Sequence, residues 1–262
     1  MEQISLVQQL LVVLSGVIVG FSLGLIGGGG SILAVPLLLY VVGYHNPHVV
    51  IGTTALAVAL TAFINLIPHW RAGNVLWKPA ILFAIPGALG ATLGAQIGKI
   101  FPGKELLFLF ALLMIGVAVS MLRRNSSAQK PVREGRAMVV ALVLVSFGVG
   151  LLSGFFGIGG GFLIVPGLIF TTGMPILNAV ASYLVSVGAF GTMTAITYAS
   201  AGLVHWLIAF EYIGGGVIGG LAGARLATHL GAKKKALSRL FAGVILVVAI
   251  YMLAVNITAL HL

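Results

Sequence analysis

Long runs of apolar residues separated by short polar segments dominate the pattern along the chain. A helix needs roughly 20 consecutive apolar residues to cross the hydrocarbon core of a bilayer. Six runs of about this length carry no charged residue, and two more, Leu203 to Ala224 and Leu237 to Val255, contain one each. The six are Leu6 to Leu25, Val49 to Ile67, Pro79 to Gly98, Leu106 to Leu122, Met138 to Phe156 and Pro175 to Ser200. This pattern predicts an all-α integral membrane protein.

Two glycine-rich runs interrupt the pattern, at Gly27–Gly30 and at Gly157–Gly161. Glycine inside a helix costs about 1 kcal/mol relative to alanine, so several in close succession should end a helix. The apolar stretches that follow, Ser31 to Val42 and Gly161 to Phe170, are short for a full crossing. We therefore expect about 8–10 membrane helices, with a broken or re-entrant segment at each glycine run.

The sequence around the first glycine run occurs a second time. Residues Gly24 to Pro36 recur as Gly154 to Pro166 at an offset of 130, with seven of thirteen positions identical. Further matches continue downstream, and they include Trp77 with Trp206. The sequence therefore predicts an internal repeat of one fold, with a first membrane repeat at 1–124 and a second at 137–262. A polar linker, 125–136, joins the two repeats.

The distribution of basic residues predicts how the two repeats are oriented. Lys and Arg mark cytoplasmic loops. The loop with Arg71 and Lys78 in the first repeat has a counterpart, around Ala201 to Val204, without a basic residue. This flipped bias predicts inverted repeats, each with an odd number of crossings, and both chain ends outside. The linker, the end of the first repeat that precedes it and the loop before the last helix are then cytoplasmic, because these segments hold Arg123, Arg124, Lys130, Arg133, Arg136, Lys233, Lys234, Lys235 and Arg239.

Composition excludes several classes of function. Only 7% of the residues are charged and 60% are hydrophobic, whereas soluble domains carry about a quarter charged residues. The net charge of +10 lies in short loops, so we expect a lipid bilayer and no nucleic acid as partner. There is no cysteine, which excludes disulfides and thiolate metal sites. We expect no cofactor, no bound metal and no enzymatic activity, and Met1 to Ser5 lacks the basic start of a cleaved signal peptide.

The two glycine runs are also the best candidates for a substrate site. Broken helices at corresponding positions of two repeats point to a transport site, and a helix N-terminus with free N–H groups favours anions. A tight turn outside the membrane is the alternative interpretation of the same glycines. The candidate substrate-binding residues are Gly27, Gly28, Gly29, Gly30, Ser31, Thr53, Thr54, Gly157, Gly159, Gly160, Gly161, Ser182, Tyr183 and Arg225.

The scarcity of acidic residues favours an anionic substrate. The chain has no aspartate, and its four glutamates are Glu2, Glu105, Glu134 and Glu211. Cation transporters and channels usually place carboxylates in the membrane. The hydroxyls among the candidates have an alternative role, because Ser and Thr in membrane helices commonly bond to their own backbone. Arg225 is alternatively an interfacial anchor.

Glycines also recur at four-residue spacing, as in Gly16/Gly20/Gly24, Gly90/Gly94/Gly98 and Gly215/Gly219/Gly223. Small residues on one helix face allow close packing between membrane helices. We expect these faces to hold the helices of the bundle together or to mediate a homodimer.

The two glycine runs, each followed by Val-Pro at Val35-Pro36 and Val165-Pro166, resemble the sulfite exporter TauE/SafE family. Gly52-Thr53-Thr54, Gly73-Asn74-Val75 and the glycine-rich third helix of each repeat are similar to it as well. The second repeat departs from the pattern, with Ala181-Ser182-Tyr183 in place of Gly52-Thr53-Thr54. A related group of thiosulfate importers works through cysteines, and this chain has none.

The resemblance implies transport of a small sulfur-containing anion. We expect a secondary transporter that exports sulfite or an organosulfonate across the inner (cytoplasmic) membrane, as a multi-pass protein. Moving one negative charge out of a cell with a negative interior is favoured by about 2.3 kcal/mol per 100 mV. An anion channel and an ion-coupled importer of a sulfur-containing anion are the alternatives.

Overall fold

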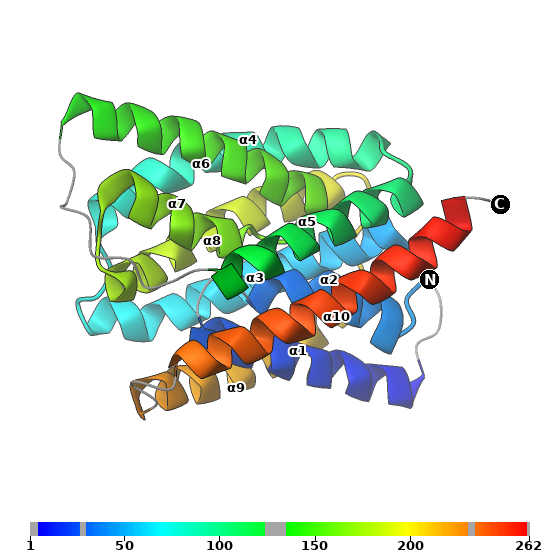
Figure 1. Ribbon diagram of the computed structural model, residues 1–262. Helices are drawn as coiled ribbons and strands as arrows, with labels where there is room; N and C mark the ends of the chain where they lie inside the picture. Colours follow the sequence, from blue (N-terminus) through cyan, green and yellow to red (C-terminus); the bar gives the residue numbers. More distant parts are fainter. Residues whose placement is uncertain (1–4, 27–29, 124–134, 230–233, 261–262) are drawn as a thin grey trace.

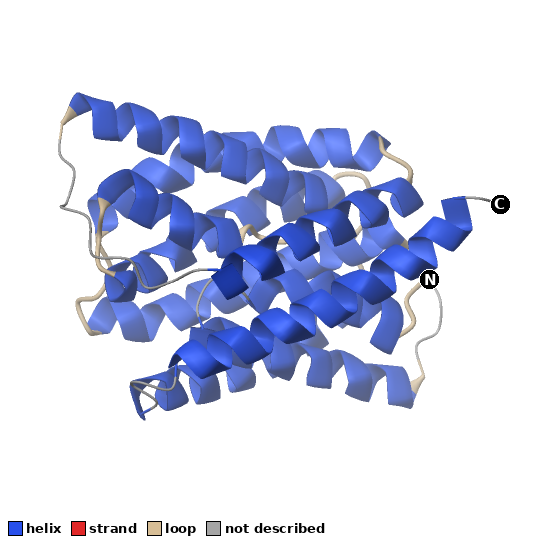
Figure 2. Cartoon of the chain, in the orientation of Figure 1, coloured by secondary structure: helices blue, strands red, loops and turns tan. Residues whose placement is uncertain are grey.

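The computed structural model describes residues 5–26, 30–123, 135–229 and 234–260. Within them the regular secondary structure is all helical, and short loops and turns join the helices (Figure 2). Eight helices are long and apolar enough to cross a membrane in this described part. They are α1 (Leu6–Ile26), α3 (Pro47–Arg71), α4 (Trp77–Ile100), α5 (Gly103–Arg123), α6 (Arg136–Phe156), α8 (Ile176–Ala199), α9 (Trp206–His229) and α10 (Lys234–Leu260). This confirms the predicted all-helical membrane protein.

Two shorter apolar segments follow the glycine runs, also as predicted. After the first run the chain forms a 3₁₀ turn, η1 (Gly30–Leu33), one α turn, α2 (Ala34–Pro36), and a wider π turn, η2 (Leu37–Val41). After the second run it forms α7 (Gly161–Thr172). The next long helix, α3, begins after Asn46, whose side chain accepts hydrogen bonds from the N–H groups of His48 and Val49 and so caps the helix.

The helices of the two halves are interleaved. In Figure 1 they lie roughly side by side, with both termini at one end of the bundle. The first helix of each half packs against the third long helix of the other, giving the pairs α1–α9 and α4–α6, while α3 packs on α8 and α5 on α10. This set of pairs is unchanged when the two halves are exchanged, so it is compatible with an inverted repeat.

Glycines bring the paired helices into backbone contact. A β-carbon at Gly20 would overlap the backbone of Gly216, and one at Gly150 would overlap the backbone of Gly87. The glycine faces of α1, α4 and α9 therefore pack against helices of the same chain, as expected for small residues in membrane helices. Any contact between two copies of the protein would have to use other faces.

Candidate functional site

After the first break the chain, from Gly30 onward, packs along α1. Gly27, Gly28 and Gly29 lie outside the described residues, and Gly30 begins the returning segment. A β-carbon at Gly30 would lie only 2.5 Å from the backbone nitrogen of Leu23, so a side chain here would force the segment away from α1. The returning segment runs antiparallel to α1 and reaches its beginning, where the amide of Gln8 donates to the carbonyl of Val42 at 3.2 Å.

The second break lies inside the bundle. Gly157, Gly159 and Gly160 have φ angles of +67°, +65° and +66°, which only glycine adopts without strain. The position of a β-carbon at Gly159 lies 3.1 Å from Val58 and 3.3 Å from Val187, so this glycine sits between α3 and α8. All residues from Gly157 to Gly161 are buried. The break is therefore enclosed by helices.

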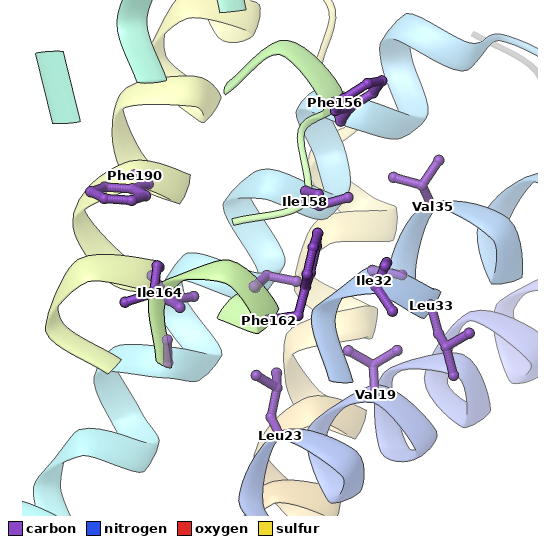
Figure 3. Packing of buried hydrophobic residues seen from close by; sticks show 14 of the residues in the cluster. Val19, Leu23, Ile32, Leu33, Val35, Phe156, Ile158, Phe162, Ile164 and Phe190 are labelled. Carbon is purple, nitrogen blue, oxygen red and sulfur yellow. The ribbon is translucent and has the colours of Figure 1, made fainter. Parts of the chain in front are cut away.

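The two breaks meet in the core of the protein. η1 contacts α7, and Figure 3 shows Ile158 and Phe162 of the second break close to Ile32 of the first. These three side chains are buried. Apolar side chains of η1 and of the second break thus pack against each other in the core.

Each break carries a buried hydroxyl without a hydrogen-bond partner. Ser31 lies in η1, and Ser153 lies near the end of α6, with its Oγ 3.0 Å from the position of a β-carbon at Gly160. Both residues are fully buried, and neither Oγ has a partner. Buried hydroxyls are nearly always hydrogen-bonded. These two are therefore available as donors to a ligand.

The N-terminus of α7 adds backbone donors beside Ser153. Its N-cap residue is Gly160, which has no side chain to cap the helix. The first N–H groups of a helix lack partners within it, and they carry a partial positive charge. Gly160, Gly161 and Ser153 thus form a buried donor cluster suited to an anion.

Two of the predicted hydroxyls instead anchor loops. Thr53 Oγ1 accepts a hydrogen bond from the N–H of His205 at 2.9 Å, and Ser182 Oγ accepts one from the N–H of Leu76, also at 2.9 Å. The two loops precede α9 and α4 and lie at opposite ends of the bundle (Figure 1). The structure therefore does not bring Thr53 and Ser182 together at the breaks.

The remaining predicted residues lie in three different settings. Thr54 Oγ1 donates to Val50 O in its own helix at 2.8 Å, which matches the alternative role of such hydroxyls. Tyr183 OH donates to Leu23 O at 3.3 Å and so joins α8 to the first break. Arg225 is exposed near the end of α9. It follows Ala224, whose backbone packs against Gly24 near the end of α1.

Sequence reasoning missed six buried residues whose polar side-chain atoms have no hydrogen-bond partner: Ser153, Ser186, Thr61, Asn65, Tyr198 and Tyr212. The signal in the sequence that could have identified them is an isolated polar residue within an otherwise apolar helix. Among the described residues, the fully buried polar side chains are neutral, with no Lys, Arg, Asp or Glu. The same part of the chain holds no cluster of three or more His, Cys, Asp or Glu that could bind a metal.

A bundle of eight membrane-length helices with buried helix breaks is typical of membrane transporters. The family described as "Sulfite exporter TauE/SafE" matches residues 12–252. The chain therefore belongs to this family. No solved structure matches the chain significantly.

Similar proteins carry transporter names from several organisms. A "Probable membrane transporter protein" of Xylella fastidiosa (strain Temecula1) is 51% identical over 252 residues, covering 94% of this chain and 96% of that protein. "Probable membrane transporter protein YunE" of Bacillus subtilis is 26% identical, covering 82% and 87% of the two chains. "Probable membrane transporter protein MJ0441" of Methanocaldococcus jannaschii is 29% identical, covering 74% and 72%.

Proposed function

We propose that this transporter exports a small sulfur-containing anion, sulfite or an organosulfonate, and binds it where the two breaks meet. The observation that carries the proposal is the unpaired, fully buried hydroxyl of Ser153 beside the uncapped start of α7. Ser31 offers a second unpaired hydroxyl from the other break. Together these groups supply hydrogen-bond donors, and the buried polar side chains of the described residues include no carboxylate, which suits an oxyanion.

The neutral interior favours an anion with a single negative charge. No Lys or Arg among the described residues is fully buried, so hydrogen bonds and helix ends alone offset the cost of leaving water. That cost is several kcal/mol for one ion and rises steeply with charge. Hydrogen sulfite and alkyl sulfonates carry one charge, so they are better substrates for such a site than a doubly charged oxyanion.

The ends of the bundle support an outward direction through the inner membrane. α3 ends with Arg71, α4 begins next to Lys78 and α6 begins with Arg136, at the end opposite to the two termini (Figure 1). With the positive-inside rule this end is cytoplasmic. The basic end would collect anions from the cell interior, and the membrane potential favours their exit. Lys99 and Lys104 lie at the other end, which we assign to the outside.

The packing between the breaks favours a carrier over a channel. Ile32, Ile158 and Phe162 fill the contact between η1 and the second break. In a channel, these side chains would have to stay apart for as long as the pore is open. In a carrier, they would have to move apart only briefly in each transport cycle. We therefore place the anion channel second and the ion-coupled importer third.

Substitution of Ser153 tests this proposal. Ser153→Ala removes a donor to a charged ligand, which is worth about 1.5–3 kcal/mol, so the affinity for sulfite should fall about 10- to 100-fold. Ser146→Ala is the matched control on α6, because Ser146 is equally buried but its Oγ donates to Val143 O at 3.0 Å. The measurement is efflux of labelled sulfite and methanesulfonate from proteoliposomes at equal amounts of folded protein.

Two outcomes would contradict the proposal, one by refuting the function and the other by refuting the site. If the unchanged protein moves no sulfur-containing anion, the proposed function is wrong. If it moves sulfite and the Ser153 and Ser146 variants both match it, the function stands and the site is wrong.

A further inference from the structure

Two polar side chains on α3 face α9 without a hydrogen-bond partner. Thr61 and Asn65 are one helical turn apart and so lie on one face. Thr61 Oγ1 lies 2.7 Å from the position of a β-carbon at Gly216, and the amide of Asn65 packs in the same way on Gly220. Thr61 is 2% exposed and Asn65 is 4% exposed. Thr61 Oγ1 and both polar atoms of the Asn65 amide lack partners.

Thr61 differs from the other buried threonines of the described residues. Most of them bond to a carbonyl of their own helix, as Thr54, Thr171 and Thr194 do at 2.7–2.9 Å, and Thr53 accepts a hydrogen bond from a loop N–H. Thr61 makes no such bond. An unpaired amide in an apolar interior is costly, and polar groups kept inside a membrane bundle usually belong to a substrate pathway. The pair therefore needs an explanation beyond packing.

The second half of the chain shows that the fold does not require this pair. The offset of 129 that relates Thr53 to Ser182 and Leu76 to His205 also relates Thr61 to Phe190 and Asn65 to Thr194. The ring of Phe190 occupies the space beside Gly87, as Thr61 does beside Gly216, and it stacks on Phe83 with ring centroids 6.3 Å apart. Thr194 Oγ1 donates to Phe190 O. At these equivalent places, the first half has two polar side chains without hydrogen-bond partners. The second half has an aromatic ring and a threonine that is bonded to its own helix.

We propose that Thr61 and Asn65 form a second binding station for the transported anion, between the breaks and the end of the bundle where α3 ends. This inference rests on the proposed function. The Thr61 hydroxyl and the Asn65 amide nitrogen supply donors, and Asn65 Oδ1 supplies one acceptor. Gly216 and Gly220 place no side chain over the pair, so a small displacement of α9 from α3 exposes it to substrate.

The chemistry of the pair selects among sulfur-containing anions. A protonated oxyanion such as hydrogen sulfite has acceptor oxygens for Thr61 and the Asn65 amide nitrogen, and its O–H group can donate a hydrogen bond to Asn65 Oδ1. A sulfonate has the same acceptor oxygens but no O–H donor. It would leave Asn65 Oδ1 unpaired, and sites built for a polar group reject ligands that lack it. Asn65 should therefore favour hydrogen sulfite over sulfonates.

The test compares Asn65→Leu and Thr61→Val with Thr194→Val. Leucine and valine keep the approximate size of the replaced side chains and remove their unpaired polar atoms, so thermal stability should stay equal or rise. Affinity for sulfite should fall at least tenfold, and the preference for sulfite over methanesulfonate should shrink in Asn65→Leu. Thr194→Val removes a hydroxyl that is already satisfied, and it should keep sulfite affinity and selectivity. Calorimetric binding, unfolding temperature and proteoliposome efflux provide the readouts.

Each alternative result has a distinct meaning. Unchanged sulfite affinity and selectivity in both α3 variants, with transport intact in the unchanged protein, overturn the second station and leave the proposed function standing. A lower unfolding temperature together with unchanged affinity shows a structural role and also overturns it. Absence of sulfite transport by the unchanged protein refutes the proposed function itself.

Discussion

The two breaks occupy equivalent places in the two halves, yet their surroundings differ. At the second break Ser153 faces Gly160 with an unpaired hydroxyl, and at the first break the equivalent residue is Leu23, which faces Gly30. Farther along α3 and α8 the bias reverses, because Thr61 and Asn65 in the first half oppose Phe190 and Thr194 in the second. Polar groups thus alternate between the halves rather than repeating.

The positions that do repeat have a different character. Thr53 and Ser182 make the same loop contact, and Gly20 and Gly150 make the same helix contact in their respective halves. Symmetric positions therefore hold the fold, while the asymmetric positions make the interiors of the two halves chemically different.

The largest expected effect concerns the repeated helix contacts. Gly150 lies on the backbone of Gly87, so Gly150→Leu should prevent α6 from approaching α4 and cost well over the roughly 1–3 kcal/mol of ordinary overpacking. Gly148, two residues away on the same helix, is exposed and has nothing within 4 Å of its β-position. Gly148→Leu should fold normally. The yield of monodisperse protein in detergent and its unfolding temperature measure the difference, and equal yields would contradict the proposed packing.

The second prediction separates crowding at the break from backbone strain. Gly159 and Gly202 both have positive φ, +65° and +71°, but only Gly159 has neighbours within 4 Å of its β-position. Leucine at either site should cost about 1–2 kcal/mol of backbone strain. Gly159→Leu should also abolish sulfite efflux, whereas Gly202→Leu should retain it. Efflux at matched amounts of folded protein is the measurement, and near-normal efflux by the Gly159 variant would exclude a function for this break.

The smallest effect is expected at the matched loop anchors. Thr53→Val and Ser182→Ala each remove one hydrogen bond to a loop N–H, which is worth about 0.5–1.5 kcal/mol. Because the two contacts are equivalent, both variants should lower the unfolding temperature by similar amounts and leave sulfite affinity unchanged. A large loss of affinity in only one variant would assign that hydroxyl to the substrate instead.

Sequence alone predicted the parts of this protein that depend on local patterns. Apolar run length gave the eight spans, and glycine runs gave the two breaks, because both effects act within a few residues. The partners of each helix were beyond reach, since a glycine face such as Gly16/Gly20/Gly24 reveals close packing without revealing that α9 is the neighbour. Sequence alone places Thr53 and Ser182 at the site because they follow the two breaks along the chain. In the structure, the segment after each break first runs away from that break, so both hydroxyls lie at loops instead. Ser153 was overlooked because its repeat equivalent is Leu23.

We propose that the two halves of the protein have the same fold in opposite orientations in the membrane. Ala72 and Ala201 are equivalent, exposed residues in the loops before α4 and α9, and the chain has no native cysteine. Single cysteines at these two positions should therefore behave oppositely in intact cells toward a membrane-impermeant maleimide. We predict labelling of Ala201→Cys from outside and labelling of Ala72→Cys only after the membrane is opened. Labelling of both positions from the same side would contradict the inverted arrangement.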